Sequence, residues 1–99
     1  MHAVVNRLRL KHPIDPEVFA AAQRDLPPRA AQIDGLLAFH VVRVADDELV
    51  VVILGDSAAA LERMRDEIGN EWMSDNIVPH LAAPTDRIAG ESVVSFQRA

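Results

Sequence analysis

The chain has 99 residues, of which 49% are hydrophobic and 25% are charged, a composition that fits one globular domain over residues 1–99 and leaves no room for a second core. Ten lysines and arginines against 15 aspartates and glutamates give a net charge of −5 without a basic cluster, which disfavours nucleic acid and anionic membranes as partners. There is no cysteine, and no stretch approaches the roughly 20 apolar residues of a membrane span, so we expect a cytoplasmic protein without disulfides or a cysteine metal site.

The N-terminal third predicts a strand followed by a helix. Residues 3–10 form the strand, and one of its sides carries Val4, Asn6, Leu8 and Leu10. Asp15 caps the helix, and a proline occupies its first turn. We expect Pro27-Pro28 to interrupt this helix, because neither proline has an amide hydrogen to donate.

The middle of the chain predicts a hairpin. Residues 36–44 alternate in direction, so that one side of this strand carries Leu37, Phe39 and Val41 and the other carries Leu36, Ala38, His40, Val42 and Val44. A short polar connector leads to residues 49–54, which are apolar at every position. Successive side chains of a strand point to opposite faces, so this strand needs cover on both faces of its sheet.

The last third predicts a second helix and a final strand. Asp56 or Ser57 caps the helix, and we expect Gly69 to end it. Its core side carries Leu61, Met64 and Ile68. Residues 72–81 form a further short helical segment, and residues 88–97 form the last strand, with Val94 and Phe96 on one side.

The resulting order, strand-helix-strand-strand-helix-strand, predicts a ferredoxin-like α+β fold with a four-stranded antiparallel sheet. Right-handed crossovers place both helices on one side of that sheet. The other face, which includes half of the all-apolar strand, is uncovered in a single copy. We therefore expect a homodimer in which this face packs on a second copy of the chain.

Three segments carry a family resemblance: residues 5–10 (VNRLRL), 35–41 (GLLAFHV) and 51–57 (VVILGDS). They resemble the dimeric α+β barrel superfamily and, within it, the small antibiotic-biosynthesis-monooxygenase-like proteins, over nearly the whole chain. The resemblance implies a homodimer with its sheets face to face and a pocket in each subunit between sheet and helices. Activities in this family include cofactor-free oxidation of polyphenols to quinones, degradation of haem and isomerisation of small lactones.

Asn6 is an amide on an otherwise apolar strand face. An unpaired buried amide costs about 1 to 3 kcal/mol, so Asn6 needs a hydrogen-bond partner. In a structural role that partner is a neighbouring backbone group or a water molecule, and in a functional role it is a substrate or bound oxygen. His40 lies either at the dimer interface or in the pocket, where it could accept a phenolic proton while Asn6 or Arg7 stabilises the anion. The side chains expected to wall the pocket are Trp72, Phe39, Phe19 and Met64.

A haem site is the alternative that the resemblance implies. In the haem-degrading branch an Asn followed by Arg-Leu works with a Trp and a His of the second helical region, which would be Asn6, Trp72 and His80 here. The position of that Trp is occupied by about Met64, and Trp72 follows Gly69. As structural residues, Trp72 would be an apolar plug and His80 a surface or helix-end side chain.

The four histidines are too widely spaced for a metal motif, and the scattered glycines form no phosphate loop. Three hypotheses follow, and whether the protein is an enzyme stays open among them. The first is a cofactor-independent monooxygenase acting on an aromatic, polyphenolic metabolite, in which Asn6 positions substrate or oxygen and His40 or His80 is the base. The second is a haem-binding or haem-degrading oxygenase, and the third a non-catalytic ligand-binding or interaction module.

Overall fold

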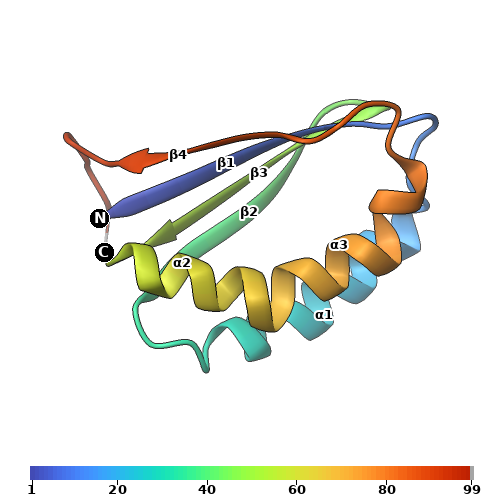
Figure 1. Cartoon of the computed structure of the whole chain (residues 1–99). Coiled ribbons are helices and arrows are strands. Elements are labelled where there is room, and N and C mark those ends of the chain that lie inside the picture. Colours follow the sequence, from blue (N-terminus) through green and yellow to red (C-terminus); the bar gives the residue numbers. More distant parts are fainter. Residues whose placement is uncertain (99) are drawn as a thin grey trace.

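In the computed structural model, which describes residues 1–98, a four-stranded antiparallel sheet is covered by helices on one side (Figure 1). The elements are β1 (His2–Arg9), α1 (Pro16–Ala30), β2 (Leu36–Ala45), β3 (Glu48–Gly55), α2 (Ala58–Met64), the π-helical turn η1 (Arg65–Gly69), α3 (Asn70–Asn76), the 3-10 turn η2 (Val78–His80) and β4 (Asp86–Glu91). The strand order β2-β3-β1-β4 confirms the predicted ferredoxin-like α+β fold. Among these residues no helix is both long and apolar enough to cross a membrane.

The core lies between the sheet and the helices. β1 and β3 form the centre of the sheet and pair Leu8 with Leu49. These two side chains and Ile77, directly after α3, are buried to 1% exposure or less. Burial of an aliphatic side chain of this size contributes roughly 1.5 to 3 kcal/mol. The predicted alternation of the first strand is confirmed, since Val4, Leu8 and Leu10 are buried.

The opposite face of the sheet carries no helix (Figure 1). On the two edge strands, Val42, Val44 and Ile88 are 43%, 52% and 71% exposed. The central strands add the half-buried Val5, Val50 and Val52. The all-apolar strand β3 is therefore covered by helices on one face and left open to solvent on the other in a single copy.

α1 begins as predicted but runs through the two prolines. The carboxylate of Asp15 accepts a hydrogen bond from Glu17 N at 2.9 Å and caps the helix. Pro27 and Pro28 lie inside the helix, so the predicted interruption was wrong. The ring of proline fixes φ near the helical value, and the two carbonyl groups that lose a donor belong to exposed residues, where water can bond them.

The second helical region is one continuous rod rather than a helix ended by Gly69 (Figure 1). Ser57 caps it, since Ser57 Oγ accepts a hydrogen bond from Ala60 N at 3.2 Å. Gly69 has helical dihedrals, φ −61° and ψ −47°, so the predicted stop was wrong. Glycine ends a helix where it adopts the left-handed conformation. Here the buried Ile68 and the half-buried Trp72, on either side of Gly69, hold the rod against the sheet.

β2 contains a bulge between Leu36 and Ala38. The extra residue turns Leu36 onto the helix side, where it packs with Phe39 in the core. The predicted alternation put Leu36 and Phe39 on opposite sides and was wrong at this position. A bulge changes the phase of a strand by one residue, and the hydrophobic pattern alone does not reveal it.

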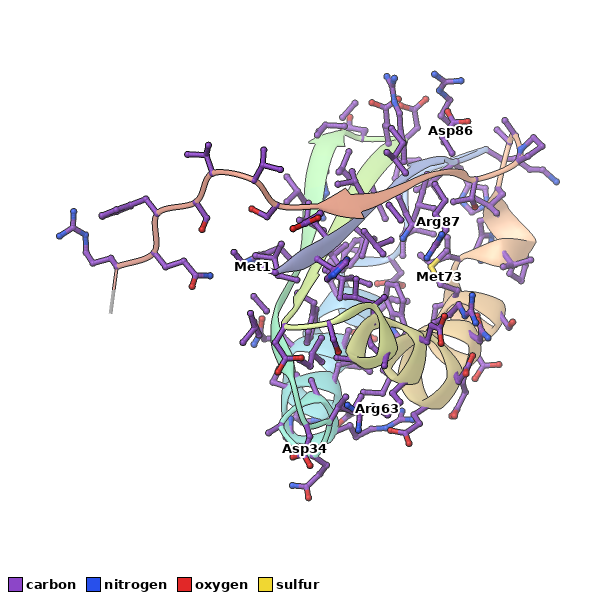
Figure 2. All side chains as sticks on the ribbon, turned by 60° about the vertical axis from the view of Figure 1, so that its left-hand side comes forward. Met1, Asp34, Arg63, Met73, Asp86 and Arg87 are labelled. Atoms are coloured by element: carbon purple, nitrogen blue, oxygen red, sulfur yellow. The ribbon has the colours of Figure 1, made fainter. Side chains whose placement is uncertain are left out.

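β4 is shorter than predicted. It ends at Glu91, whose partner across the sheet is His2, and residues 92–98 leave the sheet (Figure 2). The strand predicted over residues 88–97 was wrong in its second half, because the pairing of β4 with β1 ends at the Glu91–His2 pair. Residues 92–98 have the apolar pattern of a strand but pair with no strand of the described chain.

Candidate functional site

A pocket of about 220 Å³ opens between the sheet and the α2–α3 rod. Its walls are mostly apolar and include Val4, Phe39, Val51, Ile53, Met64 and Trp72. Its polar lining consists of Asn6, Arg65, Asn70 and Arg87. Apolar walls with a few convergent polar groups are typical of small-molecule sites.

Asn6 and Arg87 lie side by side on the sheet wall of this pocket. The β1–β4 register pairs them directly, and side chains at such positions lie about 4.5 to 5.5 Å apart at Cβ. Figure 2 shows Arg87 beneath β4 beside Met73 of α3, whereas the neighbouring Asp86 points away. The ion pairs within residues 1–98 use five other arginines, so Arg87 has no carboxylate partner in this part of the chain.

The π-helical turn shapes the rod side of the pocket. Arg65 and Gly69 of η1 and Asn70 and Trp72 of α3 line it. A π turn adds one residue to a helical turn and so rotates everything that follows relative to a regular α-helix. In this position Trp72 contacts both buried clusters of the hydrophobic core, one that contains Leu8 and one that contains Ile68. Turns of this kind occur frequently at functional sites.

The polar groups of the pocket favour an anionic ligand. Among its lining residues are two guanidinium groups and two carboxamides, but no His, Asp or Glu. Arg65 Nε lies 3.3 Å from Asp66 Oδ1 at the surface, which leaves Arg87 as the uncompensated cation. Hydrogen bonds to a charged group contribute roughly 1.5 to 3 kcal/mol. Arg87, with a further hydrogen bond from the Asn6 amide, can therefore hold an oxyanion.

Half of the predicted site residues line this pocket: Asn6, Phe39, Met64 and Trp72. Arg7 and His40 lie on the open face of the sheet, because the register places them opposite Val50 and Val52. Arg7 Nη2 lies 3.1 Å from Glu48 Oε1 in an ion pair at the surface. Neither Arg7 nor His40 therefore lines the pocket that contains Asn6.

His80 lies in η2, away from the pocket. Its Nδ1 lies 3.2 Å from His12 Nε2, so the two rings share a hydrogen bond. Asn6 and Trp72 come together as the haem hypothesis requires, but no histidine among residues 1–98 lines their pocket to serve as an axial ligand. The residues present therefore do not fit haem. Residues 1–98 contain no cluster of three or more side chains suited to holding a metal ion.

Phe19 lines a second hollow, of about 380 Å³, between α1 and β2. The guanidinium carbon of Arg43 lies 5.3 Å from the centre of its ring, within the range of a cation–π contact. Phe39 and Trp72 line both this hollow and the pocket, so the two spaces are neighbours separated by aromatic side chains.

Arg87 and Asn70 are pocket residues that sequence reasoning missed. Arg87 directly precedes the strand predicted over residues 88–97, where a charged residue is usually assigned to solvent. Its position beside Asn6 depends on the pairing of the first and last strands. The helical continuation past Gly69 that places Asn70 was likewise not predicted.

No family model matches the chain, and no curated protein matches it by sequence. Solved structures do match. A protein of unknown function from Nitrosomonas europaea is 18% identical, with 99% of this chain and 94% of that chain covered and a TM-score of 0.71. SnoaB, a cofactor-independent oxygenase from Streptomyces nogalater, is 13% identical over 98% and 97% of the two chains, with a TM-score of 0.66.

A monooxygenase from the gene ActVA-Orf6 of Streptomyces coelicolor, in complex with the ligand nanaomycin D, is 13% identical over 99% of this chain and 92% of that chain, with a TM-score of 0.68. At such identities the likeness establishes the fold, and it extends over nearly the full length of each chain. The resemblance that the sequence carries is thereby confirmed, and the chain has the fold of the antibiotic biosynthesis monooxygenases.

Proposed function

We propose that the protein is a homodimeric cytoplasmic oxygenase that oxidises a small hydroxylated aromatic compound with molecular oxygen and without a cofactor. The observation that carries the proposal is the Asn6–Arg87 pair, which presents a hydrogen-bond donor and a cation without a carboxylate partner at the solvent-exposed rim of an apolar pocket. The fold is shared with SnoaB, which is described as a cofactor-independent oxygenase. Trp72 and Met64 form walls of an open pocket rather than filling it, which favours a ligand-processing role.

The proposed chemistry starts from the phenolate, because the anion can pass an electron to oxygen far more readily than the neutral phenol can. Arg87 stabilises the phenolate and Asn6 donates a hydrogen bond to it, while the proton leaves to water, since no lining residue is a base. The phenoxyl radical and superoxide then combine at a ring carbon. Proton uptake and loss of water give the quinone, so one phenol and one O2 yield one quinone and one H2O.

The pocket volume limits the substrate to one or two rings. An engineered apolar cavity of about 150 Å³ holds benzene, and the pocket here measures about 220 Å³. Phe39 and Trp72 supply aromatic surfaces against which such a ring can pack. We therefore propose hydroquinones and naphthols as the substrate class.

Oxygen consumption tests this proposal. The protein is incubated with one-ring and two-ring phenols in an oxygen electrode, with a chelator present, and quinone formation is followed by absorbance. We expect one O2 consumed per quinone. Arg87→Ala should lose this activity, whereas Arg24→Ala, which removes an exposed arginine paired with Asp25, should retain it. If no compound of this class is turned over or bound, the proposal is wrong.

The dimer is proposed on the open face of the sheet. Its apolar edge residues are 43% to 71% exposed at Val42, Val44 and Ile88, and a face-to-face pair would bury them. Val52→Asp puts a charge in the middle of this face and should give monomers in sedimentation at micromolar protein. Val52→Ala, which keeps the face apolar, should remain dimeric. A wild-type protein that sediments as a folded monomer would contradict the proposal.

A further inference from the structure

His12 and His80 face each other although 68 residues separate them in the chain. His12 follows β1 and His80 is the last residue of η2, two segments that lie at the same end of the molecule (Figure 1). His80 Nδ1 lies 3.2 Å from His12 Nε2, and the two ring planes are inclined at 67°. His12 is exposed and His80 is half-buried, so the pair is accessible from solvent. The spacing of the histidines in the sequence predicted no metal motif, because only the fold brings these two together.

The backbones beside the two rings are bonded to each other. Lys11 N donates to His80 O at 2.8 Å, and an isolated bridge pairs Leu10 with Leu81. A proline follows His12 and another precedes His80, and each restricts the backbone next to its histidine. The two backbone positions are therefore fixed relative to each other before any ion binds.

The tautomer of His12 is the one that a metal ligand needs. Its Nδ1 lies 3.0 Å from Pro13 O, and a carbonyl oxygen only accepts, so Nδ1 carries the proton. The lone pair of His12 is then on Nε2, the atom that faces His80. Metal-binding histidines almost always donate their other ring N–H to a carbonyl group, a carboxylate or water in this way.

The distance between the two ring nitrogens matches that of two ligands on one ion. Zinc binds imidazole nitrogens at about 2.0 to 2.1 Å with tetrahedral angles, which places two bound nitrogens about 3.3 Å apart. The distance from His80 Nδ1 to His12 Nε2 is 3.2 Å. On binding, His80 gives its Nδ1 proton to water and takes one at Nε2, so its ring stays neutral. Water completes the coordination, since the described chain offers no cluster of three or more ligating side chains.

We propose that His12 and His80 together bind a divalent transition-metal ion such as Zn²⁺. Imidazole nitrogen suits Zn²⁺, Cu²⁺ and Ni²⁺, whereas Mg²⁺ and Ca²⁺ take oxygen ligands. Neither histidine lines the pocket that contains Asn6, so the site is independent of the proposed oxygenase activity. The ion joins η2 to the segment between β1 and α1 and stabilises the folded chain, because an ion that binds only the folded state favours that state.

Zinc titration tests the proposal. Wild-type protein is titrated with ZnCl2 in a calorimeter, and thermal unfolding is followed with and without zinc. We expect one Zn²⁺ per chain and a melting temperature that rises with zinc concentration. His12→Ala and His80→Ala should each weaken binding at least about tenfold, the loss that removal of a supporting partner alone causes at such sites. His2→Ala, which removes a histidine at the opposite end of β1, should bind zinc as the wild type does.

Nuclear magnetic resonance supplies a readout that needs no variant. Co²⁺, a paramagnetic ion that imidazole also binds, should shift the ring-proton signals of His12 and His80 and leave those of His2 and His40 in place. A wild-type protein that binds no zinc overturns the proposal, as does equal zinc binding after both His12 and His80 are replaced. A tenfold loss in only one single variant also overturns it, because the ion would then have one histidine ligand and not a pair.

Discussion

Asn6 and Arg87 are direct partners in the β1–β4 register, on the side of the sheet that the helices cover. A strand-to-strand pair places their side chains on one wall of the pocket, which holds a neutral donor and a cation together at a fixed spacing. Rigid strands position such a pair better than loops do. Both residues are therefore the first targets for mutation.

Arg87→Ala should weaken binding of a phenolate about 10- to 100-fold, which corresponds to the loss of a charge-assisted hydrogen bond. Binding of the methyl ether of the same phenol, which cannot ionise, should change little. The activity of the variant should also rise toward higher pH, because ionisation of the substrate then depends on the solvent alone. Titration calorimetry with the phenol and its ether measures the first effect, and a pH–rate profile measures the second.

Arg87→Lys is the conservative control, since it retains the charge and should lose less than Arg87→Ala. Combining Arg87→Ala with Asn6→Ala should cost less than the sum of the two single changes in free energy, because both groups bind one oxygen. Strict additivity would indicate that the two side chains act on different parts of the ligand.

Trp72 reports ligand binding directly, because it is the one tryptophan of the chain and it lines the pocket. A hydroxylated aromatic ligand should change the intensity or wavelength of its emission with a saturating dependence on concentration. Trp72→Phe keeps an aromatic wall and should raise KM more than it lowers kcat. An emission spectrum unchanged at saturating substrate would place the ligand elsewhere.

His80 should not act as a haem ligand, since that side chain shares a hydrogen bond with His12 outside the pocket. We expect hemin to give the same absorption spectrum with the wild-type protein and with His80→Ala. A Soret band shifted by the wild-type protein and lost in the variant would revive the haem hypothesis.

Leu8→Ala should reduce the free energy of unfolding by roughly 2 to 5 kcal/mol, through loss of buried surface and the cavity that it leaves. Leu8 is 0% exposed at the centre of the core, whereas Leu37, the matched leucine on β2, is 52% exposed. Leu37→Ala should therefore change stability much less. Urea denaturation of both variants, at equal protein concentration, compares them.

Gly35→Ala should destabilise the fold by about 1 to 3 kcal/mol. Gly35 has φ +84°, a left-handed conformation, and a Cβ there would collide with the carboxylate of Asp56. Gly90→Ala is the control, since a Cβ at that position meets nothing within 4 Å. Adding Asp56→Ala to Gly35→Ala should recover only the part of the loss that comes from the collision. Thermal unfolding separates the two contributions.

Local patterns were sufficient to predict much of the fold and part of the site. The alternation that puts Asn6 with Leu8 on the covered face also puts Arg7 on the open face, and the same logic separates His40 from Phe39. The period of a strand is two residues, so one assigned face determines the other. The chirality of the crossovers correctly predicted that both helices cover the same side of the sheet.

Tertiary effects account for what the sequence did not reveal. Gly69 and Pro27 are helix breakers by propensity, yet both lie inside helices. Packing of the neighbouring side chains holds Gly69 in its helix, whereas water can bond the carbonyl group that Pro27 leaves without a donor. Arg87 becomes a pocket residue through pairing of the first and last strands, a long-range contact without a local signal. The bulge at Leu36 likewise depends on the neighbouring strand.

The π turn fixes the direction in which the aromatic wall faces. Asn70 N donates to Arg65 O across the turn, one residue further than in an α-helix. Regular winding of the same residues would carry Trp72 about 100° further around the rod axis, away from the two core clusters that it now contacts. Deleting one residue in the turn would restore regular winding and keep Trp72 on its present side of the rod, so this place tolerates a one-residue change in length without reshaping the aromatic wall.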